Sequence, residues 1–446
     1  MMADPRYTAV KLLDKTFRSG SYSNIQLDAG LKNSELSPQD KRFCTALYYG
    51  VIERKITLDH ILTGLSSRPL SKLDSVIITI LRCGIYQLLY MENVPDNAAV
   101  NESVKLAKKF GKTSASGMVN AVLRNFIRKG KKYDMSKNEI ERMSVEYSIP
   151  AELIESVVND YGMENAKDLF VDSLGEAPTF IRVNNIGDDE ADEDREFLEK
   201  WGDRSFFEKS PLLPHCYKVN DKVGLYNLES NDMFIMGLFH VQDLASQLCC
   251  AAVAPTENDI VLDMCAAPGG KTFTMAEMMD GKGQIYAFDL HKHRVGLIEE
   301  GAARLELSNV KAEARDATKY YDDIPKATKI LCDVPCSGYG VIRKKPEIRY
   351  KSISDFERLP EIQYKIAENA LNYLADGGEM VYSTCTVRKA ENEDVVQKLL
   401  ANHPELELVE LPQPLGSVFS GGMAAIFPHH FGSDGFFIAK LRKIQQ

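Results

Sequence analysis

The sequence lacks several features that would each indicate a particular class of protein. Its 446 residues contain no uninterrupted apolar run of about eighteen or more, which argues against a membrane span. The N-terminus has no basic stretch followed by an apolar one, so we expect no secretory signal and a cytoplasmic location. The nine cysteines include no pair of CxxC motifs, and we therefore expect free thiols and no bound metal.

The charge of the chain is unevenly distributed. The net charge of −10 argues weakly against a nucleic-acid-binding protein. Residues 1–132, however, carry 21 Lys and Arg against 11 Asp and Glu. Part of the compensating negative charge lies in an acidic run at 188–194, which is typical of a solvated loop. The acidic total can therefore conceal a basic, RNA-facing region near the N-terminus.

Hydrophobic periodicity divides the chain into three regions. Residues 1–132 have apolar side chains at helical spacing and indicate an all-α domain. Residues 133–240 suggest a helical connector and a small α+β unit, with strands near 179–183 and 217–219. Residues 241–446 alternate between strands and helices, which predicts an α/β domain with a doubly wound, mostly parallel sheet. We expect strands at 260–264, 284–288, 310–314, 329–332, 379–382 and 435–439.

A glycine-containing loop follows the first strand of the α/β region. It reads Cys265, Ala266, Ala267, Pro268, Gly269, Gly270 and Lys271. One interpretation is a phosphate-binding loop, but Cys265 stands where that motif needs glycine and Pro268 lacks an N–H donor. The alternative is an adenosyl cofactor, which the Gly269-Gly270 backbone can approach closely. We favour the second interpretation.

Three carboxylates stand at the predicted ends of successive strands. Asp289 follows Lys271 by eighteen residues and is placed to accept hydrogen bonds from ribose hydroxyls. Asp316 ends the third strand and is placed to meet an adenine amino group, and Asp333 ends the fourth. Each alone suits a solvated loop, but together they indicate a ligand site.

Two cysteines follow neighbouring strands of the predicted sheet. Cys336 comes after the fourth strand and Cys385 after the fifth, so both thiols should face the same crevice. Cys332 lies within the strand and is expected in the core. The simplest alternative is that all of these thiols only pack against neighbours. A reactive role would require a thiolate, which the positive charge of Lys271 is placed to favour.

Three segments resemble motifs of a known family. The segments CAAPGGKT, DVPCSGYG and YSTCTVRKAENE resemble motifs I, IV and VI of RNA 5-methylcytosine methyltransferases. The chain as a whole, from about residue 5 onward, resembles the bacterial RsmB/Sun (Fmu) branch, which carries an N-terminal NusB-like helical domain. The resemblance implies a class I methyltransferase fold for residues 241–446.

The resemblance also implies an activity. It implies S-adenosyl-L-methionine as cofactor and 16S ribosomal RNA as partner, with methyl transfer to C5 of the cytosine at position 967. Separately from the resemblance, we expect a monomer. Residues 265–271, Asp289, Asp316 and Asp333 match the cofactor contacts. Cys385 matches the nucleophile, and Cys336 matches the cysteine that assists product release.

Other assignments stay open at this stage. DNA 5-methylcytosine enzymes use the Pro-Cys cysteine as nucleophile, so the roles of Cys336 and Cys385 can be exchanged. Thiolate addition to C6 makes C5 nucleophilic, and Asp333 is placed to hold the exocyclic amine of the cytosine. The alternatives are a non-catalytic RNA-binding or antitermination module, and a 5-methylcytosine methyltransferase that acts on another RNA.

A basic segment directly follows Cys336. Five of the nine residues from 343 to 351 are Lys or Arg. The simplest interpretation is a solvated loop, and the functional one is a set of RNA contacts beside the thiols. Tyr350 is predicted to stack on a base. The candidate RNA contacts are Arg343, Lys344, Lys345, Arg349 and Tyr350.

Overall fold

The computed structural model describes residues 4–19, 23–32, 34–186, 194–201, 206–220, 228 and 231–444. The chain forms two compact units. The first comprises Met1–Gly175 and Ile342–Ile353, and the second comprises Glu176–Val341 and Ser354–Gln446. These limits do not coincide with the predicted boundaries at 132 and 240. Within the described residues, no helix has the length and apolar character needed to cross a membrane.

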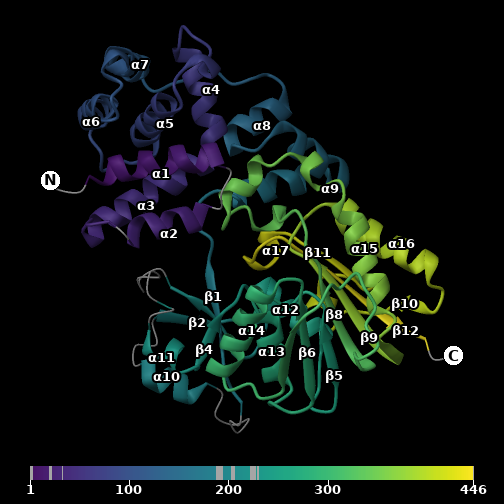
Figure 1. The fold of residues 1–446 in the computed structure, drawn as a ribbon. Coiled ribbons are helices and arrows are strands. Elements are labelled where there is room, and N and C mark those ends of the chain that lie inside the picture. The colour runs from purple at the N-terminus through teal and green to yellow at the C-terminus, as the bar shows by residue number, and fades with distance from the viewer. Residues whose placement is uncertain are drawn as a thin grey trace. The chain divides into compact units, whose positions relative to one another are not determined.

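The first unit is helical, as predicted for the N-terminal region (Figure 1). Its helices enclose one apolar core that contains Leu13, Leu47 and Leu123. Ser37 caps α3 by accepting a hydrogen bond from the Asp40 N–H, as expected for a serine that precedes a proline-initiated helix. The α-helices are α1 (Pro5–Ser19), α2 (Ser23–Lys32), α3 (Pro38–Glu53), α4 (Lys55–Leu65), α5 (Ser75–Tyr90), α6 (Asp96–Lys109), α7 (Ser116–Arg128), α8 (Glu139–Tyr147) and α9 (Ala151–Asp172).

Helices α8 and α9, predicted as a connector, belong to the first unit. The Thr57 hydroxyl donates to the Val145 carbonyl at 2.6 Å, and the Ile56 N–H donates to the Ser148 hydroxyl at 2.9 Å. These bonds attach the end of α8 to the first turn of α4. The connector is therefore part of the helical unit and not a separate domain.

The second unit begins with a small antiparallel sheet in the order β2-β3-β1-β4. Its strands are β1 (Thr179–Val183), β2 (Phe207–Lys209), β3 (Cys216–Val219) and β4 (Phe239–Val241), with α10 (Arg195–Trp201) and α11 (Asp232–Ile235). Phe197, Phe207 and Phe239 form an aromatic core. Most of the predicted acidic loop, residues 188–193, lies outside the described residues. Its last residue, Asp194, is buried and accepts a hydrogen bond from the Tyr217 hydroxyl.

The main sheet confirms the predicted doubly wound fold. Its order is β10-β12-β9-β8-β5-β6-β7, and β11 pairs with β12. The five strands from β9 to β7 in this order are parallel, and β12 runs antiparallel to β9. The strands are β5 (Ile260–Asp263), β6 (Gln284–Asp289), β7 (Val310–Ala314), β8 (Ala327–Asp333), β9 (Leu374–Thr384), β10 (Leu406–Leu408), β11 (Met423–Ile426) and β12 (Phe436–Lys443).

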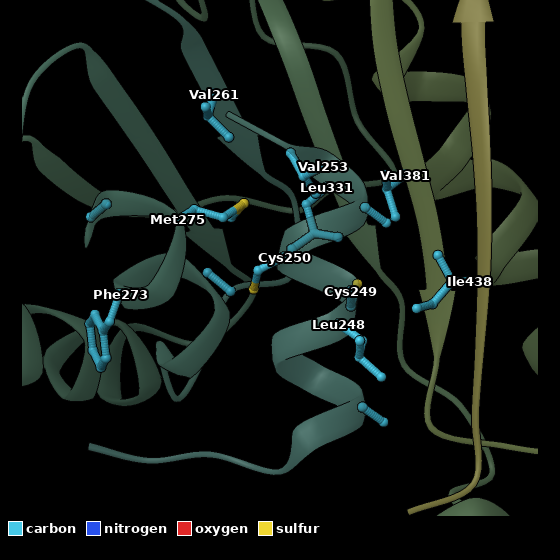
Figure 2. Close-up of a cluster of buried hydrophobic side chains, with 14 of the residues drawn as sticks. Leu248, Cys249, Cys250, Val253, Val261, Phe273, Met275, Leu331, Val381 and Ile438 are labelled. Carbon is cyan, nitrogen blue, oxygen red and sulfur yellow. The ribbon is translucent and has the colours of Figure 1, made fainter. Parts of the chain in front are cut away.

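Helices cover both faces of this sheet. Alternate residues of each strand point to opposite sides, and the apolar ones on each side pack against the helices there. Figure 2 shows α12 (Leu244–Val253) packed with Leu331 of β8, Val381 of β9 and Ile438 of β12. The neighbouring strand residues Ile330 and Met380 pack on the other face. On the first face lie α12, α13 (Gly270–Met278) and α14 (Lys292–Arg304), and on the second lie α15 (Leu359–Ala370) and α16 (Glu393–Asn402).

The strand order reverses between β5 and β8, which are neighbours. Ligands of doubly wound sheets bind outside the carboxyl ends of the strands at such a reversal. The segments that follow β5, β6, β8 and β9 therefore share the edge of the sheet where a site is expected. These segments carry the glycine-containing loop, Asp289, Cys336 and Cys385.

Candidate active site

The loop after β5 folds closely against the neighbouring strand. The Ala266 N–H donates to the Phe288 carbonyl of β6 at 2.7 Å. Gly269 has φ of +113°, a conformation that other residues rarely adopt, and a Cβ there would lie 2.2 Å from the Phe273 ring. Glycine is therefore required where the loop turns into α13.

Asp289 is the last residue of β6, and its side chain is almost fully buried. Its carboxylate accepts a hydrogen bond from the His291 N–H at 3.2 Å and pairs with Arg294 at 2.9 Å. Arg294 also donates to the Ala267 carbonyl at 2.7 Å. Arg294 thus links the predicted ribose-binding carboxylate to the loop after β5. Sequence reasoning missed this residue, which lies on the exposed first turn of α14.

Asp263, at the end of β5, is a second residue that sequence reasoning missed. It is fully buried, and its Oδ2 accepts a hydrogen bond from the Thr272 hydroxyl at 2.7 Å. Its Oδ1 is buried with no hydrogen-bond partner among the described residues. Burial raises the pKa of Asp263 to about 7. The only sequence signal was an acidic residue inside a predicted apolar strand.

Asp316 lies two residues beyond β7, at the far side of the parallel strands. Its Oδ1 accepts hydrogen bonds from the N–H and hydroxyl groups of Thr318 at 3.1 and 2.7 Å. These bonds hold the pKa of Asp316 below its ordinary value, with Lys319 contributing. The carboxylate therefore shapes a local turn, and its predicted contact with an adenine stays a prediction.

Lys271 and Asp333 form an ion pair at the strand reversal. Lys271 Nζ lies 2.8 Å from Asp333 Oδ2, and the Ser383 hydroxyl donates to Asp333 Oδ1 at 2.9 Å. Burial opposes the charge of Lys271, but Asp333 outweighs this effect and raises the pKa of Lys271. The first turn of α13 is thereby connected to the ends of β8 and β9. Lys271 was predicted to favour a thiolate, and this role stays a prediction because the ion pair that it forms is with Asp333.

Cys336 and Cys385, which were predicted to share a site, lie next to each other. Cys336 Sγ lies 3.2 Å from Cys385 Sγ, and both residues are half-buried. All nine cysteines are free, and Cys332 lies in the core as expected. The hydrogen bond with Cys385 raises the pKa of Cys336 well above its ordinary value, and burial adds to this effect.

Gly340 fixes the turn that follows Cys336. Its N–H donates to the Cys385 carbonyl at 3.0 Å, and its carbonyl accepts from the Gly435 N–H at 2.9 Å. A Cβ at Gly340 would lie 1.9 Å from the Gly435 carbonyl oxygen, so a larger residue would separate these backbones. Close backbone approach therefore keeps the Cys336 turn against Cys385.

Comparisons with known proteins match both parts of the chain. Residues 3–128 match the NusB family, and residues 250–442 match the family described as 16S rRNA methyltransferase RsmB/F. The probable ribosomal RNA small subunit methyltransferase B of Bacillus subtilis (strain 168) is 36% identical over 448 residues, which cover 98% of each chain. The chain belongs to the ribosomal RNA small subunit methyltransferase B family.

Other members of the methyltransferase B family and solved structures agree with this assignment. The probable family member from Synechocystis is 32% identical and covers 99% of this chain and 100% of its own. The crystal structure of PH0851 is 27% identical, with a TM-score of 0.79 over 99% of this chain and 100% of its own. NSun6 from Pyrococcus horikoshii, solved with SFG, is 25% identical, with a TM-score of 0.58 over 67% of this chain and 99% of its own.

One predicted RNA contact of this methyltransferase B family member is wrong. Arg349 is fully buried within the first unit, where its guanidinium donates to the carbonyls of Glu53 at 3.2 Å and Ser173 at 2.9 Å. The Tyr350 hydroxyl donates to the Ile52 carbonyl at 2.6 Å. Both residues lie in η6 (Pro346–Tyr350) and stabilise the helical unit. The buried Arg349 cannot bind RNA directly, whereas Tyr350 is half-buried and its stacking on a base stays a prediction.

The remaining basic residues of the segment have a different environment. Lys344 and Lys345 are exposed, and Arg343 is half-buried. The charge pattern of 343–351 suggested one continuous surface, but the segment turns its last residues inward. That Lys344 and Lys345 contact phosphate groups therefore remains a prediction.

Proposed function

We propose that the protein transfers a methyl group from S-adenosyl-L-methionine to C5 of a cytosine in 16S ribosomal RNA. The observation that carries the proposal is the 3.2 Å approach of Cys336 and Cys385 beside the Lys271–Asp333 pair. Packing alone does not require two half-buried thiols next to an ion pair at the ligand-binding edge of a parallel sheet. Following the family, we assign position 967 as the target, and we propose a cytoplasmic, monomeric enzyme.

The residues at the ends of β5 and β6 fit the cofactor. Asp289 presents a carboxylate suited to the two ribose hydroxyls, and Leu290 beside it is 60% exposed and offers an apolar surface to a base. The unpartnered Oδ1 of Asp263 marks a buried polar position next to the loop at 265–271. S-adenosyl-L-methionine supplies an electrophilic methyl group when bound there. The chain has to position this group and exclude water from it.

Cys385 is the proposed nucleophile. C5 of cytosine is too weakly nucleophilic to accept a methyl group until a thiolate adds to C6. The hydrogen bond with Cys385 and burial raise the pKa of Cys336, which favours the protonated thiol at that position. We assign the thiolate to Cys385 because this residue matches the nucleophile of the family motif. After methyl transfer the C5 proton leaves and the Cys385–C6 bond breaks. Cys336 is close enough to Cys385 to assist this elimination.

Asp333 is the proposed contact for the cytosine. One carboxylate oxygen bonds Lys271 and the other bonds Ser383, which fixes the orientation of the side chain. A carboxylate in this position can accept a hydrogen bond from the exocyclic amine of cytosine. Lys271 pairs with Asp333 at 2.8 Å and helps to hold the carboxylate in place next to the thiols.

The RNA contacts are proposed to come from exposed cations. Lys344 and Lys345 follow Cys336 by a few residues in sequence, and each can neutralise a phosphate. A cytosine in a single-stranded loop is the less costly target, because a base-paired one must first be unstacked.

The experiment that tests the proposal is transfer of labelled methyl from S-adenosyl-L-methionine to undermethylated 16S RNA, followed by bisulfite mapping. We expect one 5-methylcytosine, at position 967 of the RNA. The same modification should be absent from 16S RNA of cells that lack this protein. Methylation of a different RNA instead would show that 16S RNA is not the substrate. Cofactor binding without any transfer would instead support a non-catalytic RNA-binding module.

A further inference from the structure

Two buried polar residues lie just beyond the Cys385 turn. Glu391 ends the short helix η8 (Lys389–Glu391), and Asn392 follows it. Both are fully buried, and neither was assigned a role by the sequence motifs. A buried carboxylate is costly unless its hydrogen bonds and charge are satisfied, so its partners indicate what it does.

Glu391 holds the turn that carries Cys336. Its Oε2 accepts hydrogen bonds from the Ser337 N–H at 2.9 Å and from the Gln363 amide at 3.0 Å. The same Gln363 amide donates to the Pro335 carbonyl at 2.9 Å. The residues immediately before and after Cys336 are therefore both fixed through the Glu391 side chain.

Asn392 holds the turn that carries Cys385. Its Oδ1 accepts a hydrogen bond from the Thr384 hydroxyl at 2.6 Å, and its Nδ2 donates to the Thr386 carbonyl at 3.0 Å. These contacts again lie on each side of the cysteine. The two turns are also joined directly, because the hydroxyls of Ser337 and Thr386 lie 2.7 Å apart.

Hydrogen bonding alone does not explain the charge of Glu391. A neutral glutamine would accept the same bonds from Ser337 and Gln363 with a lower desolvation cost. The carboxylate instead requires a counter-ion, which Arg388 supplies at 3.1 Å. Around Cys336 the other acidic groups are Cys385, Asp333 and the buried phenol of Tyr382, whose hydroxyl donates to the Glu391 carbonyl.

We propose that the Glu391–Asn392 pair positions the two thiols for the proposed reaction. Glu391 fixes the Cys336 turn and places a negative charge near its thiol. Asn392 fixes the Cys385 turn. The charge of Glu391 disfavours a thiolate at Cys336, so the proton stays on Cys336 and the reactive charge stays on Cys385. The assignment of roles to the two thiols rests on the proposed function, whereas the effect of Glu391 on Cys336 does not.

Glu391→Gln removes the negative charge of the side chain but keeps its size and an acceptor oxygen. Glu391→Ala removes the charge and the hydrogen bonds together. The matched control is Glu379→Gln, which neutralises a half-buried carboxylate in the middle of β9, paired with Lys329, Lys440 and Arg442. We expect Glu391→Gln to lower kcat by up to about 100-fold while KM for RNA changes little, because small displacements of reacting groups have effects of this size. The covalent RNA adduct should accumulate, and the control should keep kcat. A kcat for Glu391→Gln equal to that of the control would overturn the proposal.

The double variant Glu391→Gln/Cys336→Ala tests whether Glu391 acts through Cys336. Adduct release should be no slower than in Cys336→Ala alone, since residues that act as a unit are not additive. Independent, additive losses would contradict the proposal.

A second readout needs no RNA. The rate of Cys336 alkylation by iodoacetamide, followed by peptide mass spectrometry across pH, should shift to lower pH in Glu391→Gln by about half a pH unit or more. An unchanged profile would refute the effect of Glu391 on the thiol. If the shift occurs but the wild-type protein transfers no methyl group, the proposed function fails and the role of Glu391 stands.

Discussion

The Sγ atoms of Cys336 and Cys385 lie 3.2 Å apart, although 49 residues separate the two cysteines in the sequence. The approach follows from the topology, because β8 and β9 are neighbours in the sheet (Figure 1). The two strands are parallel, with Asp333 opposite Ser383. Each cysteine comes shortly after its strand ends. Two sulfurs at this distance do not both ionise readily, since like charges disfavour each other. A charge on either sulfur therefore disfavours ionisation of the other.

Lys271→Met should reduce catalysis with little effect on RNA affinity. The change removes the cation paired with Asp333 and leaves that carboxylate without its partner at the site of reaction. The loss of one electrostatic contact of this kind lowers kcat by about 100- to 1000-fold. Single-turnover methyl transfer measures the effect, and Lys282→Met, which removes an exposed lysine paired with Asp280, is the matched control. Equal activity of the two variants would contradict a role for Lys271.

Asp263→Asn should change how stability depends on pH. The pKa of Asp263 is about 7 in the folded protein because of burial, above its ordinary value of 3.8, so the folded state binds the proton more tightly. Ionisation therefore destabilises the fold as pH rises from about 4 to about 7, by roughly 4 kcal/mol in total. The variant should gain stability relative to wild type across this window, as measured by urea unfolding in the absence of cofactor.

Asp259→Asn is the control for that measurement. Burial opposes the charge of Asp259, but hydrogen bonds from Thr328 and Thr256 hold its pKa below the ordinary value. Its stabilising effect is therefore complete above about pH 4 and is lost only at lower pH. Relative stability of this variant should stay constant between about pH 4 and 7. A parallel rise in both variants would mean that Asp263 is not the group responsible.

Arg349→Ala should lower the stability of the protein, whereas Lys345→Ala should weaken RNA binding. Arg349 is buried and donates to backbone carbonyls of Glu53, Tyr147 and Ser173, so its loss should destabilise the first unit by about 3 kcal/mol or more. Lys345 is exposed, and its loss should change stability by less than about 0.5 kcal/mol. Lys345→Ala should instead weaken RNA binding and reduce its salt dependence, while cofactor affinity stays constant. Denaturant unfolding and RNA titrations at several salt concentrations separate the two predictions.

The sequence predicts the parallel sheet well because buried strands carry a strong local signal. The strands at 179–183 and 310–314 have the predicted limits, and β5, β6 and β8 differ by one or two residues. The short strands β2, β4, β10 and β11 were missed, because three or four residues rarely show a periodicity. Cys336 and Cys385 were brought together correctly because strand order fixes which ends are neighbours.

What the sequence could not predict depends on partners that are distant in the chain. Arg349 sits in a strongly basic stretch and was expected to face RNA, yet tertiary contacts with α3, α8 and α9 bury it. Asp263 and Glu391 are acidic residues whose burial becomes evident only once their strands and turns are packed. Local composition cannot distinguish such residues from solvated ones.

The most direct test of the account is the covalent adduct between this protein and 16S RNA, measured by denaturing gel electrophoresis with S-adenosyl-L-methionine present. Cys385→Ala should form no adduct, because no other thiolate adds to C6. Cys336→Ala should accumulate the adduct, because elimination of Cys385 from the methylated base is slowed. The reverse pattern, with adduct lost in Cys336→Ala and accumulating in Cys385→Ala, would contradict the assignment of Cys385 as the nucleophile.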